Sequence, residues 1–178
     1  EISFLSDDFS VLYVASNSNP FLPIYYKFSA LWGGHEGSML LFILILSLWI
    51  VLFSLFTNYQ SVRDKNYLHG FTSLIFLSFA GFTIFTSNPF ERLLPISPLN
   101  GTDLNPLLQD FAFTIHPPML YLGYAGLVIP FAIALGRCVG VMEAWALRIK
   151  KWTTLAWSFL TLGTVSYTHL RAHETPVN

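Results

Sequence analysis

Charged side chains are scarce in this sequence. Asp, Glu, Lys and Arg make up only 11% of its 178 residues, whereas about a quarter is usual for a soluble domain. The net charge of −1 excludes a basic surface able to hold nucleic acid. The single cysteine, Cys138, excludes a disulfide framework and a cysteine-based zinc site. With 53% hydrophobic residues, intrinsic disorder is excluded as well, and the composition indicates a membrane protein.

Four segments carry no charged residue and are long enough to cross a bilayer, which needs about 20 apolar residues at 1.5 Å each. They predict an all-α membrane protein, a polytopic helical bundle with about four transmembrane helices. A soluble α protein with buried helices is the alternative, but too few charges remain to coat its surface. Pro130 predicts a kink in the third segment. The segments are 39–57, 70–88, 117–136 and 152–170.

Lysine and arginine are distributed unevenly between the two sides of this predicted bundle. Residues 58–69 and 137–151 together hold six of them, and residues 1–38 and 89–116 hold two. The positive-inside rule therefore predicts that the first pair of segments is cytoplasmic and that the second pair forms long outward-facing loops. The two outward cations are Lys27 and Arg92.

Two histidines, His35 and His116, lie on the predicted outward side, each close to the start of a span. Pro117 and Pro118 suit a first helical turn, which predicts that His116 lies at or beside a helix N-cap. The positive end of the helix dipole favours neutral imidazole there, and neutral imidazole is the form that binds haem iron. A hydrogen bond to a loop carbonyl or a helix-capping role is the alternative for both histidines.

Other residues in or near these segments have simpler interpretations. The tryptophans are expected mainly in the interfacial belt: Trp32, Trp49, Trp145, Trp152 and Trp157. Glycines are expected where the chain turns tightly into a helix (Gly33, Gly34, Gly37) or where two helices approach closely (Gly123, Gly126). Two acids, Asp103 and Asp110, are expected to be loop and capping residues.

Four sequence blocks occur in an order that resembles the CcmF family, the haem lyase components of the cytochrome c maturation system. The resemblance covers roughly residues 2–164, and its last two blocks are the most specific. The blocks are 25–38 (YYKFSALWGGHEGS), 86–95 (TSNPFERLLP), 103–110 (DLNPLLQD) and 115–124 (IHPPMLYLGY).

The resemblance implies a multi-pass protein of the bacterial inner membrane, surrounded by lipid, whose haem site faces the periplasm; an organellar inner membrane is the alternative. It implies that haem b is the cofactor. The implied partners are the haem chaperone CcmE, apocytochrome c, and the thioreduction and presentation subunits of apocytochrome c; no nucleic acid is expected. The implied haem lyase activity, covalent attachment of haem to apocytochrome c, belongs to the full-length protein in its complex. His116 is the implied axial haem ligand. We expect His35 to be a secondary contact, and Arg92 or Lys27 to meet a haem propionate.

Some features of the family do not occur in the sequence, namely its tryptophan-rich haem-handling segment and the second outward histidine ligand. The match ends near Thr164, so residues 1–164 are expected to be the N-terminal part of the assembly domain, and residues 165–178 to be foreign to it. A transporter or a quinone-linked respiratory subunit is the alternative function. Because the four spans contain no charged residue, that alternative is disfavoured.

Overall fold

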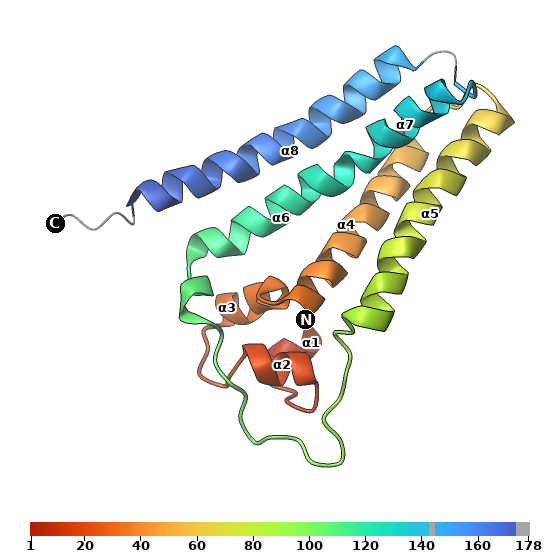
Figure 1. The fold of residues 1–178 in the computed structure, drawn as a ribbon. Coiled ribbons are helices and arrows are strands. Elements are labelled where there is room, and N and C mark those ends of the chain that lie inside the picture. Colours follow the sequence, from red (N-terminus) through yellow and green to blue (C-terminus); the bar gives the residue numbers. More distant parts are fainter. Residues whose placement is uncertain (143–144, 174–178) are drawn as a thin grey trace. The chain divides into compact units, whose positions relative to one another are not determined.

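The computed structural model describes residues 1–142 and 145–173, with the side chains of 107 and 167–173 left aside. The last five residues of the predicted foreign tail, 174–178, lie outside the described residues. The described chain is helical, and its one β-like feature is an isolated bridge between Val11 and Arg92. Figure 1 shows the helices in order: α1 (Ile2–Leu5), α2 (Leu12–Asn17), α3 (Ile24–Ser29), η1 (Ala30–Trp32), α4 (His35–Phe56), α5 (Val62–Thr86), η2 (Pro106–Leu108), α6 (Phe111–Gly126), α7 (Val128–Cys138) and α8 (Ala146–His173).

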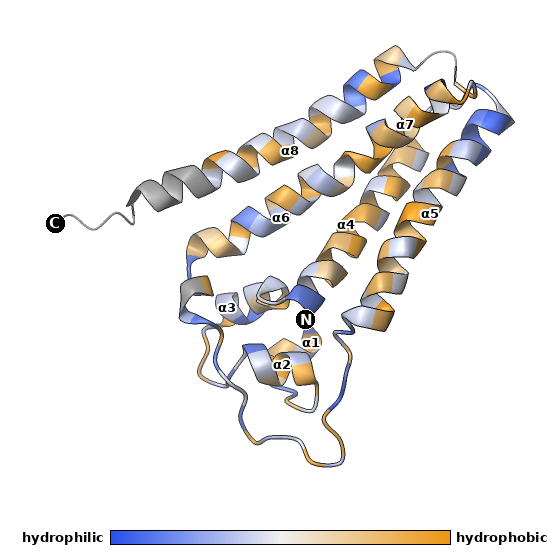
Figure 2. Ribbon diagram, viewed as in Figure 1, coloured by the Kyte–Doolittle hydropathy of each residue, from blue (hydrophilic) through white to orange (hydrophobic). Residues whose placement is uncertain are grey.

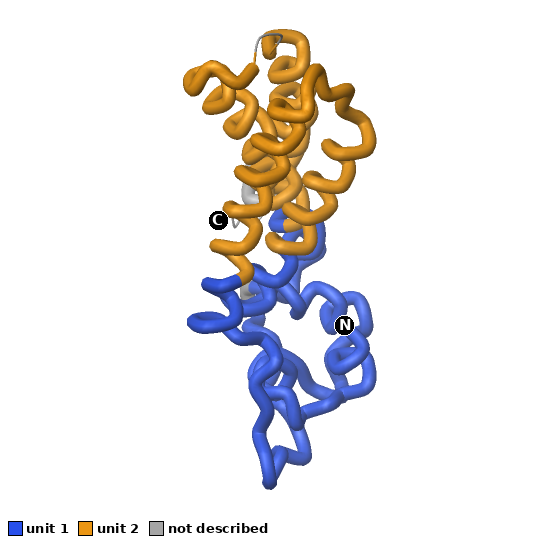
Figure 3. Tube along the Cα trace, turned by 90° about the vertical axis from the view of Figure 1, so that its right-hand side faces the viewer, with its two compact units in different colours: residues 1–41, 81–117 blue, residues 42–80, 118–178 orange. Residues whose placement is uncertain are grey.

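The chain divides into two compact units, coloured separately in Figure 3. Unit 1 comprises residues 1–41 and 81–117, and unit 2 comprises residues 42–80 and 118–178. Unit 1 contains the two segments that the sequence predicts to face outward. Unit 2 contains most of the apolar length of the long helices.

Unit 1 has a hydrophobic core of its own. Most of its buried residues come from the first thirty, including Phe4, Val14 and Ala30, and Leu104 joins them from the second outward segment. The backbone also connects the two segments, because the Thr102 N–H donates to the Ala15 carbonyl at 2.7 Å. The first of the two segments predicted to face outward therefore forms short helices around a core, whereas residues 87–105 of the second form a long non-helical connection, as predicted, whose Leu104 joins that core.

Unit 2 is built from long apolar helices. Among the described residues, three helical segments are long and apolar enough to cross a membrane, namely 35–56, 62–86 and 111–138. Figure 2 shows the dense hydrophobic colouring of α4 and α5. The fourth predicted span lies within α8, which is long enough but more polar than the other three. The chain is thus an all-α membrane protein, as predicted, with three candidate spans among its described residues.

The third span is two helices, α6 and α7, which are interrupted at Leu127. Pro130 has no N–H to donate to the Gly126 carbonyl. Around the interruption the Leu127 N–H is shared between the carbonyls of Gly123 and Tyr124, each at 3.2 Å. The predicted irregularity in this span is confirmed, and it lies three residues before the proline.

Candidate functional site

The helix that carries His116 begins earlier than predicted. Helix α6 starts at Phe111, and the Asp110 carboxylate accepts the Ala112 N–H at 3.1 Å as an N-cap. His116 is therefore the sixth helical residue and is not at an N-cap, which makes that prediction wrong. Because the effect of the helix dipole fades beyond the first turn, it no longer argues for a neutral imidazole. The capping role expected of Asp110 is confirmed.

Two prolines within α6, Pro117 and Pro118, directly follow His116. A helical carbonyl normally accepts the N–H of the residue four positions later, and for Phe113 that residue is Pro117, which has no N–H. The Trp32 indole supplies a donor instead, with Nε1 at 3.0 Å from the Phe113 carbonyl oxygen. The Trp32 side chain is buried and meets the Phe28 ring edge-on at 5.6 Å between centroids.

This hydrogen bond brings together the two chain segments that carry the predicted outward histidines. Trp32 lies three residues before His35, and Phe113 lies three residues before His116. His35 is the first residue of α4 and is exposed, with its ring edge-on to Phe82 at 6.1 Å. His116 is half-buried. Both histidines thus lie within unit 1.

The glycine-rich turn before α4 is shaped by Tyr13. The Tyr13 hydroxyl accepts the Gly34 N–H at 2.8 Å and donates to the Leu31 carbonyl at 3.0 Å. A Cβ at Gly34 would lie 2.9 Å from Cε2 of Tyr13, and one at Gly37 would lie 2.6 Å from its hydroxyl. The interpretation that these glycines allow a tight turn into the helix is confirmed.

The two cations predicted to face outward, Lys27 and Arg92, have different surroundings. Lys27 is buried, and its ammonium contacts both carboxylate oxygens of Asp7, at 2.6 and 2.7 Å. Arg92 is about half exposed, donates to the Ser10 hydroxyl at 2.7 Å and lies 3.5 Å from the Asp8 carboxylate. The hydrogen bond from Ser10 lowers the pKa of Asp8, which keeps this carboxylate ionised. Of the two, Arg92 is the cation that a further anion can reach.

Three of the five tryptophans, Trp32, Trp49 and Trp152, are buried within the protein, and the interfacial-belt position of the tryptophans stays a prediction. Trp49 Nε1 donates to the Leu122 carbonyl at 2.9 Å. Hydropathy cannot detect an indole that hydrogen-bonds another helix. For Trp32, Pro117 identifies the carbonyl that lacks a helical donor, but the sequence does not show which side chain supplies one.

Glycines also allow close helix contacts within unit 2. A Cβ at Gly126 would lie 2.6 Å from Cζ2 of Trp49 and 2.9 Å from Cβ of Ala156. At Gly123, a Cβ would lie 2.6 Å from Cδ2 of Leu160. The interpretation that Gly123 and Gly126 let neighbouring helices approach is confirmed.

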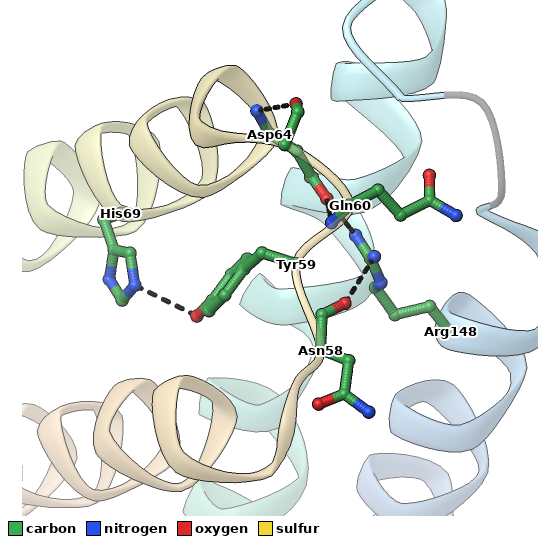
Figure 4. A network of polar contacts seen from close by, with 7 residues as sticks. Asn58, Tyr59, Gln60, Asp64, His69 and Arg148 are labelled. Atoms are coloured by element: carbon green, nitrogen blue, oxygen red, sulfur yellow. Dashed lines mark hydrogen bonds and ion pairs between the residues drawn. The ribbon is translucent and has the colours of Figure 1, made fainter.

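Unit 2 also contains a polar network at the turn between α4 and α5 (Figure 4). The Arg148 guanidinium donates to the Asp64 carboxylate and, at 2.9 Å, to the Asn58 carbonyl. The Tyr59 hydroxyl lies 3.0 Å from Nε2 of His69. Burial raises the pKa of Tyr59, which therefore keeps its proton at neutral pH. Sequence reasoning counted Arg148 only as a cytoplasmic charge and missed this network.

The family model described as "Cytochrome C assembly protein" matches residues 32–166. The chain belongs to this family. Its matched region contains Trp32, His35, Arg92 and His116, and thus every candidate haem contact except Lys27.

Curated members of the family are similar over most of the chain. The cytochrome c-type biogenesis protein CcmF of Pseudomonas aeruginosa is 50% identical over 92% of it, and the CcmF of Escherichia coli is 42% identical over 92%. The cytochrome c-type biogenesis protein CycK of Rhizobium meliloti is 42% identical over 90%. The chain spans about a quarter of the length of these relatives. No solved structure matches it.

Proposed function

We propose that this chain forms part of a haem-delivering protein, in which His116 binds haem b from the outward side of the bacterial inner membrane. The full-length protein receives haem from the chaperone CcmE and promotes its covalent attachment to apocytochrome c. In that reaction two cysteine thiols add across the haem vinyl groups as thioethers. Membership of the cytochrome c assembly family and the position of His116 support this proposal.

The observation that carries the proposal is the half-buried imidazole of His116 in the second turn of α6, a helix that contains no charged residue. Imidazole nitrogen is a common axial ligand of haem iron, and a porphyrin needs an apolar wall around it. The exposed side chains of Phe111 and Ile115 offer apolar surface on the same part of α6. No cluster of three or more His, Cys, Asp or Glu side chains able to hold a metal ion occurs among the described residues. This donor set fits axial ligation of haem better than direct chelation of an ion.

The other predicted haem contacts differ in how well their surroundings suit that role. Arg92 is the cation whose guanidinium can reach a propionate, whereas Lys27 is already paired with Asp7. His35 is exposed and begins α4, which suits a secondary contact. The second axial ligand and the contacts to apocytochrome c and its presentation subunits come from parts of the full-length protein beyond this chain.

The test is His116→Ala in a full-length protein, purified with its haem, alongside assays of cytochrome c maturation. We expect loss of outward-face haem and of maturation. With His116→Cys we expect partial haem retention and a shifted absorption spectrum, because thiolate also ligates haem iron. His35→Ala is the matched control and should lower haem content less. A wild-type spectrum and normal maturation in His116→Ala would show that this histidine is not the ligand.

A further inference from the structure

We infer that Trp32 is a positioning residue for His116, because its indole holds the turn of α6 on which His116 lies. Trp32 itself would not contact the haem iron. It acts through the Phe113 carbonyl, which Pro117 leaves without its usual helical donor. The inference rests on the proposed role of His116 and adds a second residue to that site.

The hydrogen bonding of this turn is unusual for a helix. In a regular helix the Phe113 carbonyl would accept the N–H of residue 117, but proline has none. The Trp32 Nε1–H lies 3.0 Å from the same oxygen and satisfies it. Because Trp32 is only 6% exposed, water has little access to replace this bond. A partly buried carbonyl without any partner would be costly.

The same hydrogen bond determines where His116 lies relative to the segment before α4. Helical carbonyls point toward the next turn, and for Phe113 that turn contains His116 and Pro117. Residues three apart also share one side of a helix, so the bonded carbonyl and His116 belong to the same side. Trp32 is fixed in turn by its edge-on contact with Phe28. The indole therefore connects η1 to the turn that carries the proposed ligand.

Trp49 offers a matched control of the same chemistry. Its Nε1 donates to the Leu122 carbonyl of α6 at 2.9 Å, and its side chain is also buried. The residue four positions after Leu122 is Gly126, which has an N–H. The Leu122 carbonyl therefore has a backbone donor available besides Trp49, so replacing Trp49 removes only an additional donor. Replacing Trp32 removes the donor that substitutes for the missing N–H of Pro117 at the Phe113 carbonyl.

The experiment is a double-mutant cycle in a full-length protein purified with its haem. The variants are Trp32→Phe, Pro117→Ala and the pair together, with Trp49→Phe and His116→Ala as references. Phenylalanine keeps an aromatic ring and removes only the indole donor, and alanine at position 117 restores the backbone N–H. Haem content per protein, the haem absorption spectrum and the thermal unfolding midpoint of the haem-free protein are measured for each.

We expect Trp32→Phe to weaken haem retention about five-fold and to shift the spectrum, since one hydrogen bond is worth ~1 kcal/mol. In the Pro117→Ala background the same change should cost less than about two-fold, because the helix then satisfies the carbonyl itself. Trp49→Phe should leave the spectrum unchanged. The unfolding midpoints should show the same coupling between Trp32 and Pro117 without haem.

Three results would overturn the inference. The first is an equal loss from Trp32→Phe with and without Pro117, which would mean that the indole only fills space. The second is wild-type haem binding by Trp32→Phe, and the third is a Trp32→Phe protein that does not fold and that Pro117→Ala fails to restore. If His116→Ala keeps normal haem, the proposed function fails as well. If His116→Ala loses haem while Trp32→Phe does not, only the positioning role fails.

Discussion

The Arg148 guanidinium and the Asp64 carboxylate form a salt bridge of 2.9 Å in which both side chains are largely shielded from solvent, at 12% and 4% exposure. The Gln60 N–H and the guanidinium both donate to the same Asp64 oxygen, and the Ser61 hydroxyl accepts the Asp64 N–H. Asp64 thus stabilises the start of α5, while Arg148 connects it to α8.

Arg148→Ala should destabilise the protein strongly, because it leaves a buried carboxylate without its charged partner. Breaking such a pair costs about 3–5 kcal/mol, which would appear as a lower thermal unfolding midpoint in detergent. The double variant Asp64→Ala/Arg148→Ala should lose less than the sum of the two single variants. Lys150→Ala, at an exposed position of the same helix, should change the midpoint little. Equal losses from Arg148→Ala and Lys150→Ala would contradict the prediction.

The apolar runs of the sequence predict the long helices of this protein, but not where they begin and not the short helices of residues 1–38. Helix α6 begins at Phe111 because Asp110 caps it, six residues before the apolar run that marks the third span in the sequence. The two prolines resemble a helix start, and the structure instead tolerates them inside the helix. For Pro117 the compensating donor is Trp32, which lies 85 positions earlier and which no local pattern indicates.

The outward segments show a second limit of sequence reasoning. Residues 1–38 have no clear hydrophobic period, so turn residues dominate their interpretation, and loops were expected. Their core forms only when Leu104 and the backbone around Thr102 arrive from a segment distant in sequence. His116, by contrast, could be singled out from its block of sequence, although its haem ligation is still a proposal.

The orientation derived from the lysine and arginine counts can be tested by cysteine labelling. In a Cys138→Ser background, we expect an impermeant thiol reagent added from outside to label Ser97→Cys but not Gln60→Cys. Both positions are exposed, so accessibility within the protein does not decide the outcome. Permeabilised membranes should allow both to react. The opposite pattern would place His116 on the cytoplasmic side and remove the support for an outward haem site.

Arg92→Ala should reduce haem retention slightly in a full-length protein. An exposed ion pair contributes only ~0–1 kcal/mol, so a loss of about five-fold or less is expected. Arg92→Lys keeps the charge and should retain most of the haem. Lys27→Met is the comparison that distinguishes the roles of the two cations. Because Lys27 is buried against Asp7, its replacement should lower stability rather than act through a propionate. Unchanged haem in Arg92→Ala would exclude the propionate contact.

Two glycines allow a test of the close packing around the start of α4. A Cβ added at Gly37 would meet the Tyr13 hydroxyl at 2.6 Å and also the Leu31 carbonyl oxygen, whereas one at Gly70 would meet nothing within 4 Å. Both residues lie within long helices, α4 and α5. Gly37→Ala should disrupt the hydrogen bonds of Tyr13 to Gly34 and Leu31 and lower the unfolding midpoint markedly, by the equivalent of about 1–3 kcal/mol.

Gly70→Ala should be neutral or stabilising by up to ~1 kcal/mol, because alanine favours helix and no neighbour has to move. The difference between the two variants therefore separates the combined contacts with Tyr13 and the Leu31 carbonyl from the general effect of replacing a helical glycine. Tyr13→Phe in the Gly37→Ala background supplies the last comparison. It removes the hydroxyl that the new methyl group meets, so it should cost less stability there than in the wild-type protein. An equal cost in both backgrounds would mean that Gly37 is required by the Leu31 carbonyl alone.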